Sequence, residues 1–278
     1  MRRRFWSSSV VRLALLISGV WCVYAALVLL LAPRGISTVP ILDAGLALML
    51  GLLMTIRTNR SYERWWEGRT LWGTLVNASR NLAVKVAVYA QPDEREARRM
   101  HELLTAFAYG LRDHLREGAR LADLPGDDTD EVQHIPSLLV KRIEEKQHAW
   151  VESGRILPEE LRMLDLETRI LLDVCGGCER IRKTALPHSL TWITRLSVAT
   201  ALLLIPWFLG AELGWGIVPV AGLAAFLMLV SEAVANAMEH PFGRELNQLD
   251  LTSICEAIDA STAEILEVQA APRDPTPA

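Results

Sequence analysis

Four stretches of the chain are apolar and long enough to cross a lipid bilayer as helices. They are residues 13–32, 36–56, 190–211 and 213–231, and the last continues as an amphipathic segment to His240. The hydrocarbon core of a bilayer requires about 20 apolar residues in helical form. Only Asp43 and Arg195 are charged within these stretches. The pattern therefore predicts four transmembrane helices.

Two very short connections pair these spans into hairpins. Residues 33–35 join the first two spans, and Glu212 joins the last two. Basic residues gather outside the hairpins, at Arg2, Arg3, Arg4, Arg12, Arg57, Arg60, Arg64, Arg69, Arg180, Arg182 and Lys183. Because cytoplasmic segments beside membrane spans carry an excess of Lys and Arg, we expect both termini and the middle of the chain to be cytoplasmic.

The segment between the hairpins has the periodicity of packed helices. Apolar residues recur at helical spacing, which is typical of amphipathic helices. The pattern predicts helices over residues 62–89, 93–117, 135–153, 158–186 and, after the last span, 251–269. Residues 122–133 are acidic and rich in turn-forming residues, which indicates a loop. The sequence contains no strand pattern, so we expect an all-α protein.

Composition fits a division into four parts. These are transmembrane hairpins at residues 1–56 and 188–240, a cytosolic helical domain at 57–187, and a cytosolic C-terminal segment at 241–278 with a disordered end. Of the 278 residues, 51% are hydrophobic and 22% are charged, a combination that soluble domains rarely show. The net charge of −4 gives no compositional support for binding nucleic acid.

The chain carries no pattern that indicates catalysis, a cofactor or a metal. Its six histidines form no ligand cluster, and no phosphate-binding loop or nucleophile–base arrangement is found. Cys175 and Cys178 have the C-x-x-C spacing of a redox pair or half a zinc site, but no second cysteine pair exists and His188 is the only nearby histidine. The small residues in this stretch favour close helix packing instead.

The second span carries an apolar stripe on one face. Leu48, Leu52 and Ile56 follow each other at intervals of four, about 6 Å apart along a helix. The small residues Gly45 and Gly51 lie beside the stripe and allow close helix approach. Such a stripe faces lipid or other helices in most membrane proteins. In a symmetric assembly it instead forms an apolar ring that gates a pore by expelling water.

Three motifs resemble those of the bestrophin family. Residues 56–73 read IRTNRSYERWWEGRTLWG, residues 176–187 read GGCERIRKTALP, and residues 240–243 read HPFG. All three occur in the order that the family shows, with spans in the expected places, and the resemblance covers about residues 5–270. The first two motifs are specific, whereas the third alone is weak. The chain is similar to bacterial members of the family.

The resemblance implies a homopentameric ion channel in the bacterial inner membrane, with one axial pore and no bound cofactor. In the family, the second span lines a narrow neck, and its three neck residues match Leu48, Leu52 and Ile56. Many members have an aromatic neck residue, and this chain has none. The helical cytosolic part encloses a vestibule in the family, with a second constriction at its far end.

Counting back from the second motif places this cytosolic aperture at Glu159, where the family usually has an aliphatic residue. A slip of one or two residues would give Leu157 or Glu160 instead. A ring of five carboxylates would attract cations. Alternatively, Glu159 and Glu160 simply occupy the first turn of a helix that starts at Pro158, where the helix dipole favours acids.

The resemblance leads us to expect a channel for monovalent cations, with sodium first. Animal relatives conduct anions and open with calcium bound to an acidic run, but residues 244–250 read RELNQLD and hold only two carboxylates. Asp43 would line the outer entrance, pair with Arg34 or cap its helix locally. The alternatives are a chloride channel of the same architecture and a small-solute transporter. The expected partners are further copies of the chain, membrane lipid and monovalent ions.

Overall fold

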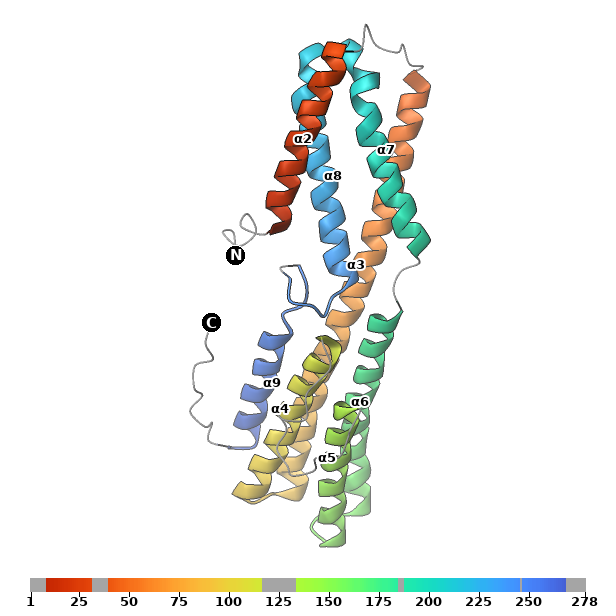
Figure 1. The fold of residues 1–278 in the computed structure, drawn as a ribbon. Helices are drawn as coiled ribbons and strands as arrows, with labels where there is room; N and C mark the ends of the chain where they lie inside the picture. Colours follow the sequence, from red (N-terminus) through yellow and green to blue (C-terminus); the bar gives the residue numbers. More distant parts are fainter. Residues whose placement is uncertain (1–8, 32–39, 117–133, 185–187, 246, 269–278) are drawn as a thin grey trace. The chain divides into compact units, whose positions relative to one another are not determined.

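The protein consists of helices arranged in two compact units. The computed structural model describes residues 9–31, 40–116, 134–184, 188–245 and 247–268, and these residues contain no strand (Figure 1). The predicted all-α class is therefore confirmed for this part of the chain. The first unit comprises Met1–Trp66 and Ala185–Gln248, and the second comprises Glu67–Thr184 and Leu249–Ala278.

In the first unit, α2 (Ser9–Leu31), α7 (His188–Leu213) and α8 (Ile217–Glu239) pack side by side (Figure 1). A 3₁₀ turn, η3 (Gly214–Gly216), joins α7 to α8. Small residues bring the helices close together. A Cβ atom on Gly222 of α8 would lie only 2.3 Å from Cys22 Sγ on α2, so a larger residue fits there only if the Cys22 side chain moves.

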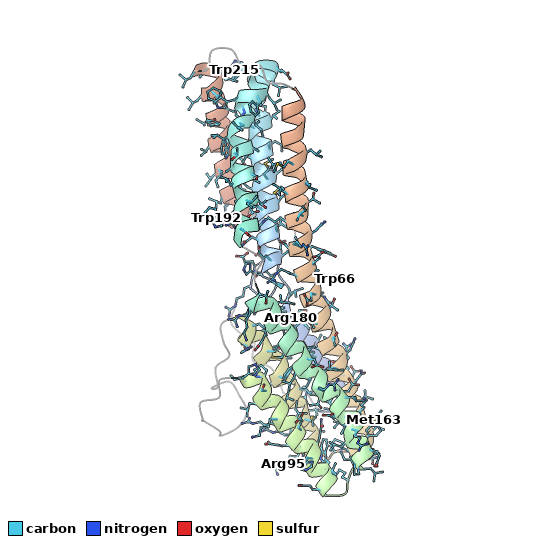
Figure 2. All side chains as sticks on the ribbon, turned by 90° about the vertical axis from the view of Figure 1, so that its right-hand side faces the viewer. Trp66, Arg95, Met163, Arg180, Trp192 and Trp215 are labelled. Atoms are coloured by element: carbon cyan, nitrogen blue, oxygen red, sulfur yellow. The ribbon has the colours of Figure 1, made fainter. Side chains whose placement is uncertain are left out.

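The helices of the first unit have the character of membrane spans. Within the described residues, Val11–Leu31, Thr191–Gly210 and Gly214–Glu239 are long and apolar enough to cross a bilayer. Figure 2 shows the exposed Trp192 and Trp215 near opposite ends of α7 and its η3 extension, and at about 1.5 Å per residue the helical segment between them spans roughly 35 Å. Aromatic side chains at that separation suit the two interfaces of a bilayer.

The second predicted span coincides with the start of α3 (Pro40–Lys85). The structure does not describe the link at residues 33–35 or the side chains of residues 40–44, which include Asp43. The total of four spans thus stays a prediction. Where the sequence suggested a span followed by a separate helix at residues 62–89, the structure has one helix, because residues 57–61 contain no Gly or Pro to interrupt it.

A π-helical turn, η1 (Val86–Ala90), ends this long helix. Gln91 then adopts a left-handed conformation with φ of 42°, and Pro92 follows, which cannot continue a helix.

The second unit is a bundle of α4 (Glu94–Arg116), α5 (Ile135–Glu152), α6 (Pro158–Lys183) and α9 (Leu251–Ile265) with residues 67–85 of α3. Helix α4 packs against α5 and α9, and α5 packs against α6. The core contains fully buried Trp72, Phe107, Leu139 and Ile143. The helices lie over the predicted ranges, although α6 and α9 end earlier. The predicted loop at residues 122–133 and the end of the chain after Val268 lie outside the described residues.

Glu96 on α4 binds several groups of α5 and the turn after it. Its Oε1 accepts hydrogen bonds from Lys146 Nζ at 2.6 Å and Trp150 Nε1 at 3.2 Å, and its Oε2 pairs with Arg155. Burial by itself raises the pKa of a carboxyl group, but here the hydrogen bonds from Lys146, Arg155 and Trp150 prevail and lower the pKa of Glu96 to about 2. The ionised carboxylate therefore stabilises the α4–α5 pair.

We expect Glu96→Gln to reduce the free energy of unfolding at neutral pH, because the amide cannot replace three ionic or charge-assisted hydrogen bonds. The folded pKa of Glu96 lies below its ordinary value of 4.5, so its contribution is complete above that value and is lost as pH falls towards about 2. Thermal unfolding of both proteins between neutral and acidic pH tests this. The difference between them should shrink over that interval, and a constant difference would contradict the assignment. Glu94→Gln, on the exposed side of the same helix turn, is the control.

Candidate functional site

The stripe of Leu48, Leu52 and Ile56 is exposed on the surface of the first unit. The exposed fractions of the three residues are 75%, 59% and 39%. On the same helix, Leu50 is buried, and with Met54 it packs against the Val198–Ala201–Leu202 side of α7 and Ala225 of α8. The two groups of side chains therefore point in different directions from α3.

Helical geometry explains this separation. Successive residues turn by about 100° around a helix, so the three stripe residues lie within about 80° of one another. Leu50 and Met54 lie roughly on the opposite side of the helix. Packing of this inner face against α7 and α8 thus directs the stripe away from the other helices of the unit. A single subunit leaves the stripe without a partner within the described residues.

Arg57, which directly follows the stripe, fixes this orientation by electrostatic contacts. It is fully buried, and its Nε and Nη2 donate hydrogen bonds to the two carboxylate oxygens of Glu232 on α8, at 2.7 and 3.0 Å. Its Nη1 donates to Thr191 Oγ1 on α7 at 3.0 Å. Glu239 adds a second carboxylate at 3.6 Å. The guanidinium thereby joins three helices at one point. Its hydrogen bonds are directional, so they fix the relative orientation of these helices more precisely than a hydrophobic contact would.

A second arginine completes this charge cluster. Arg195 Nε on α7 donates to Glu232 Oε1 at 2.8 Å, so that Glu232 is held between two guanidinium groups. Arg64 lies further along α3, and its Nε donates a hydrogen bond to the carbonyl oxygen of Glu239 at 3.1 Å. Glu239 is the last residue of α8. The end of α8 is therefore attached to α3 by both side-chain and main-chain contacts.

Sequence reasoning did not find this cluster. Arg195 is the only charged residue of the third span, and Glu232 and Glu239 follow the fourth span in the sequence. Because opposite charges in apolar helices pair with each other, basic and acidic residues on different spans could have indicated a buried ion pair. The sequence could not show which residues pair, since Arg57 and Glu232 are 175 residues apart in the chain.

The candidates for the cytosolic aperture lie at the start of α6 in the second unit. Leu157 precedes the helix and is exposed, with 62% of its surface accessible. Glu159 is also exposed, whereas the carboxylate of Glu160 turns back and accepts a hydrogen bond from the Leu157 N–H at 2.8 Å. Glu160 therefore caps the helix, in agreement with the local alternative for that residue. Leu157 and Glu159 keep side chains that are free to face a neighbouring subunit.

The C-x-x-C residues do not meet the needs of a redox pair. Burial, together with the nearby Glu179 carboxylate, raises the pKa of Cys175 to about 12, and burial likewise raises the pKa of Cys178. Reactive pairs instead have lowered thiol pKa values. A Cβ on Gly177 would approach Leu71 Cδ1 of α3 to 2.9 Å, so this glycine allows α6 to pack closely on α3.

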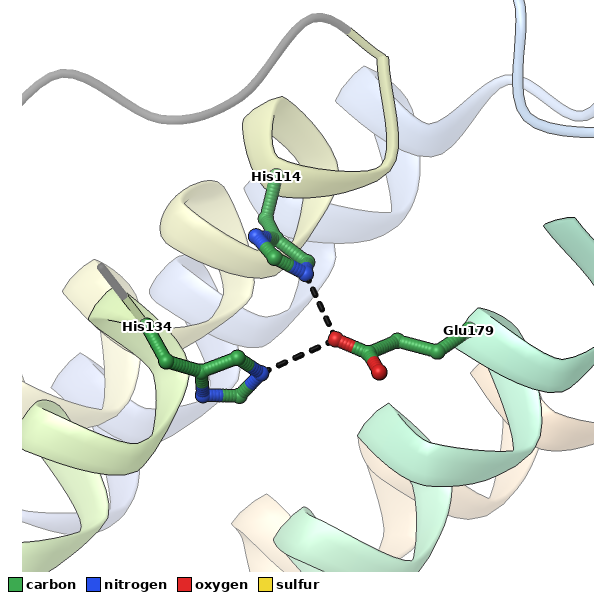
Figure 3. A group of neighbouring side chains, drawn as sticks. All are labelled: His114, His134 and Glu179. Atoms are coloured by element: carbon green, nitrogen blue, oxygen red, sulfur yellow. Dashed lines mark hydrogen bonds and ion pairs between the residues drawn. The ribbon is translucent and has the colours of Figure 1, made fainter. Parts of the chain in front are cut away.

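Two histidines do gather around a carboxylate, contrary to the expectation that the histidines form no cluster. His114 at the end of α4 and His134 at the start of α5 both contact one oxygen of Glu179 on α6 (Figure 3). The three residues are dispersed in the sequence, and only the packing of three helices brings them together. No spacing rule for metal motifs detects such a group.

Comparisons with known proteins agree with the resemblance seen in the sequence. A family model described as Bacterial/Fungal Bestrophin protein matches residues 3–264. A protein of Mesorhizobium japonicum, named as a voltage-dependent anion channel-forming protein, is 30% identical over 256 residues, covering 88% of this chain and 82% of that protein. A protein of Salmonella typhi with the same type of name is 31% identical and covers 79% of this chain and 73% of its own length.

Solved structures show the same fold. A crystal structure of a bacterial bestrophin homologue from Klebsiella pneumoniae superposes with a TM-score of 0.81 at 24% identity, covering 94% of this chain and 98% of that one. A second crystal structure, of a membrane protein, gives a TM-score of 0.85 at 23% identity, with 94% and 100% covered. At this level of identity, the likeness concerns the fold.

We expect Arg57→Ala to destabilise the first unit by about 3–5 kcal/mol, because it leaves the buried carboxylate of Glu239 and the partly buried carboxylate of Glu232 with less compensation. Arg60→Ala is the matched control on the same helix. Arg60 and its partner Glu63 are both largely exposed, so its loss should cost about 1 kcal/mol or less. Thermal unfolding of the purified full-length proteins in detergent measures both. Equal stability of the two variants would show that the cluster does not secure α3.

Proposed function

We propose that this chain, which belongs to the Bacterial/Fungal Bestrophin family, assembles into a homo-oligomeric ion channel in a cell membrane. Three apolar helices suit a membrane location, and related proteins carry channel names. The observation on which the proposal depends most is the exposed apolar stripe of α3. It faces away from the packed interior of its own subunit, as a surface that lines a shared pore must.

In the proposed channel, five copies surround one axis, and Leu48, Leu52 and Ile56 of each copy form a neck. An apolar constriction of this kind resists wetting, and ions that lose their water shell there meet a large energetic barrier. The number five follows the family resemblance. Current measurements on variants of the stripe distinguish a pore-lining surface from one that contacts lipid.

The orientation of the channel follows from the distribution of arginine and lysine. The basic residues next to the spans support a topology with both termini and residues 57–187 in the cytoplasm of a bacterial cell, and with the two hairpin loops on the outer side of the inner membrane. Glu159 would then surround the cytoplasmic aperture, with Leu157 as the alternative. Asp43 remains the proposed residue of the outer entrance.

For the conducted ion, the relatives favour an anion. Both curated relatives described above are named as anion channel-forming proteins, and this supports chloride over the monovalent cations expected from the sequence. One feature favours the cation alternative. Glu159 is exposed at the start of α6, and a ring of five carboxylates would attract cations and repel anions. We propose anion conduction as the main function and cation conduction as the second candidate.

Ile56→Ala is expected to increase the single-channel current, because shorter side chains widen the neck and make it easier to wet. Purified protein in a planar lipid bilayer provides the measurement. The control is Leu16→Ala, which shortens an exposed apolar side chain on α2 that the proposed neck does not contain. Unchanged current in Ile56→Ala, or an equal increase in the control, would remove Ile56 from the neck. Transport without discrete current steps would favour a small-solute carrier.

Reversal potentials in asymmetric potassium chloride identify the permeant ion. We expect the wild-type current to reverse near the chloride equilibrium potential, and Glu159→Gln to move the reversal further in that direction by removing negative charge from the aperture. Glu144→Gln, which neutralises an exposed carboxylate on α5, should leave the value unchanged. Reversal of the wild type near the potassium potential would replace the anion proposal by the cation candidate. An unchanged value in Glu159→Gln would exclude Glu159 from the aperture.

A further inference from the structure

We propose that His114, His134 and Glu179 form a binding site for a divalent transition-metal ion, with zinc as the preferred ion. The Nε2 atoms of the two histidines lie 2.6 and 2.9 Å from the same oxygen of Glu179 (Figure 3). The three candidate ligand atoms all lie within 4.8 Å of one another. Each comes from a different helix or helix cap of the second unit, and the proposed site is independent of which ion the pore conducts.

The donor atoms suit zinc rather than calcium or magnesium. Zinc binds imidazole nitrogen and carboxylate oxygen at about 2.0–2.2 Å, and three protein ligands with one open position are a common arrangement. Calcium requires six to eight oxygen ligands, which this group cannot provide. The three donor atoms need only separate slightly from their present hydrogen-bonded positions to admit an ion between them. The side chains are partly exposed, with 18%, 38% and 19% accessible, so an ion can enter from solvent.

Surrounding groups hold the ligands in place. Lys183 Nζ binds the second oxygen of Glu179 at 2.9 Å, which leaves Oε1 directed at the histidines. Arg182 Nη1 donates to the carbonyl oxygen of His114 at 2.5 Å and thereby connects the end of α4 to α6. Contacts of this kind orient metal ligands in known sites.

One existing interaction competes with the ion. The N–H of Ser137 donates to Nδ1 of His134 at 3.2 Å, so in the metal-free protein the neutral ring carries its proton on Nε2. When Nε2 binds the metal, this proton moves to Nδ1, and Ser137 loses its acceptor at the start of α5. The ion also replaces the two hydrogen bonds to Glu179. Coordination by three protein ligands therefore replaces these three hydrogen bonds when zinc binds.

A bound ion would connect the end of α4, the cap of α5 and the C-terminal part of α6. His114 and His134 stand on either side of residues 117–133 in the sequence, so the ion would also fix the two ends of that stretch relative to α6. Because a ligand that binds only the folded state stabilises it by mass action, zinc should raise the thermal stability of the protein. This effect is separate from conduction.

Calorimetric titration of the metal-free, full-length protein in detergent with zinc chloride tests the site. We expect one zinc ion per chain in the wild type, with binding at least about tenfold weaker in His114→Ala and in Glu179→Gln. His148→Ala removes an exposed histidine of α5 outside the site and should bind zinc as the wild type does. Calcium chloride should give no comparable binding to any of these proteins.

Circular dichroism and the zinc-dependent shift in unfolding temperature control for loss of fold. A folded variant that lacks both zinc binding and the upward shift supports the site, and His134→Asn provides a second such variant if Glu179→Gln fails to fold. The proposal is overturned if the wild type binds no stoichiometric zinc. It is equally overturned if folded site variants bind zinc as tightly as the wild type, or if His148→Ala abolishes binding.

Discussion

The pairing of Arg57 with Glu232 is the interaction on which the arrangement of the first unit depends. A fully buried guanidinium is tolerated only when carboxylates and hydroxyl groups surround it, and here α7 and α8 supply them. A contact that fixes the position of one side chain also fixes the rotation of the helix about its axis. The directions of the neighbouring side chains on that helix are then set as well. The contact therefore determines that Leu50 points inward and that Leu52 and Ile56 point outward.

The same principle, a charged side chain held by groups from several helices, recurs in the second unit. Glu96 joins α4 to α5, and Glu179 joins α6 to a histidine in the last turn of α4 and to the histidine that caps α5. These carboxylates are only partly buried, so each is stabilised by its partners without the large desolvation cost of a deep core position. The apolar core supplies most of the cohesion, and the carboxylates specify how neighbouring helices align.

A pore of the proposed type does not exist within one chain. The stripe on α3 gains a function only when several copies direct it at a common axis, and this explains why one subunit leaves large apolar side chains exposed. Ion preference would then depend on few side chains, because the neck is apolar and carries no charge of its own. The relatives' names favour anions, whereas the exposed carboxylate of Glu159 favours cations, and the electrostatic field at the aperture decides between them.

The sequence by itself determined the helices, their approximate limits and the spacing that places Leu48, Leu52 and Ile56 on one face. These are local properties, set by residues within a few turns of each other. The continuity of α3 and the capping by Glu160 are local as well, although the periodicity did not predict them. The partners of Arg57 and the meeting of His114 with His134 at Glu179 were decided only by tertiary structure. Such contacts depend on how helices distant in the chain rotate and pack together, and the periodicity of a single helix carries no information about its neighbour's rotation.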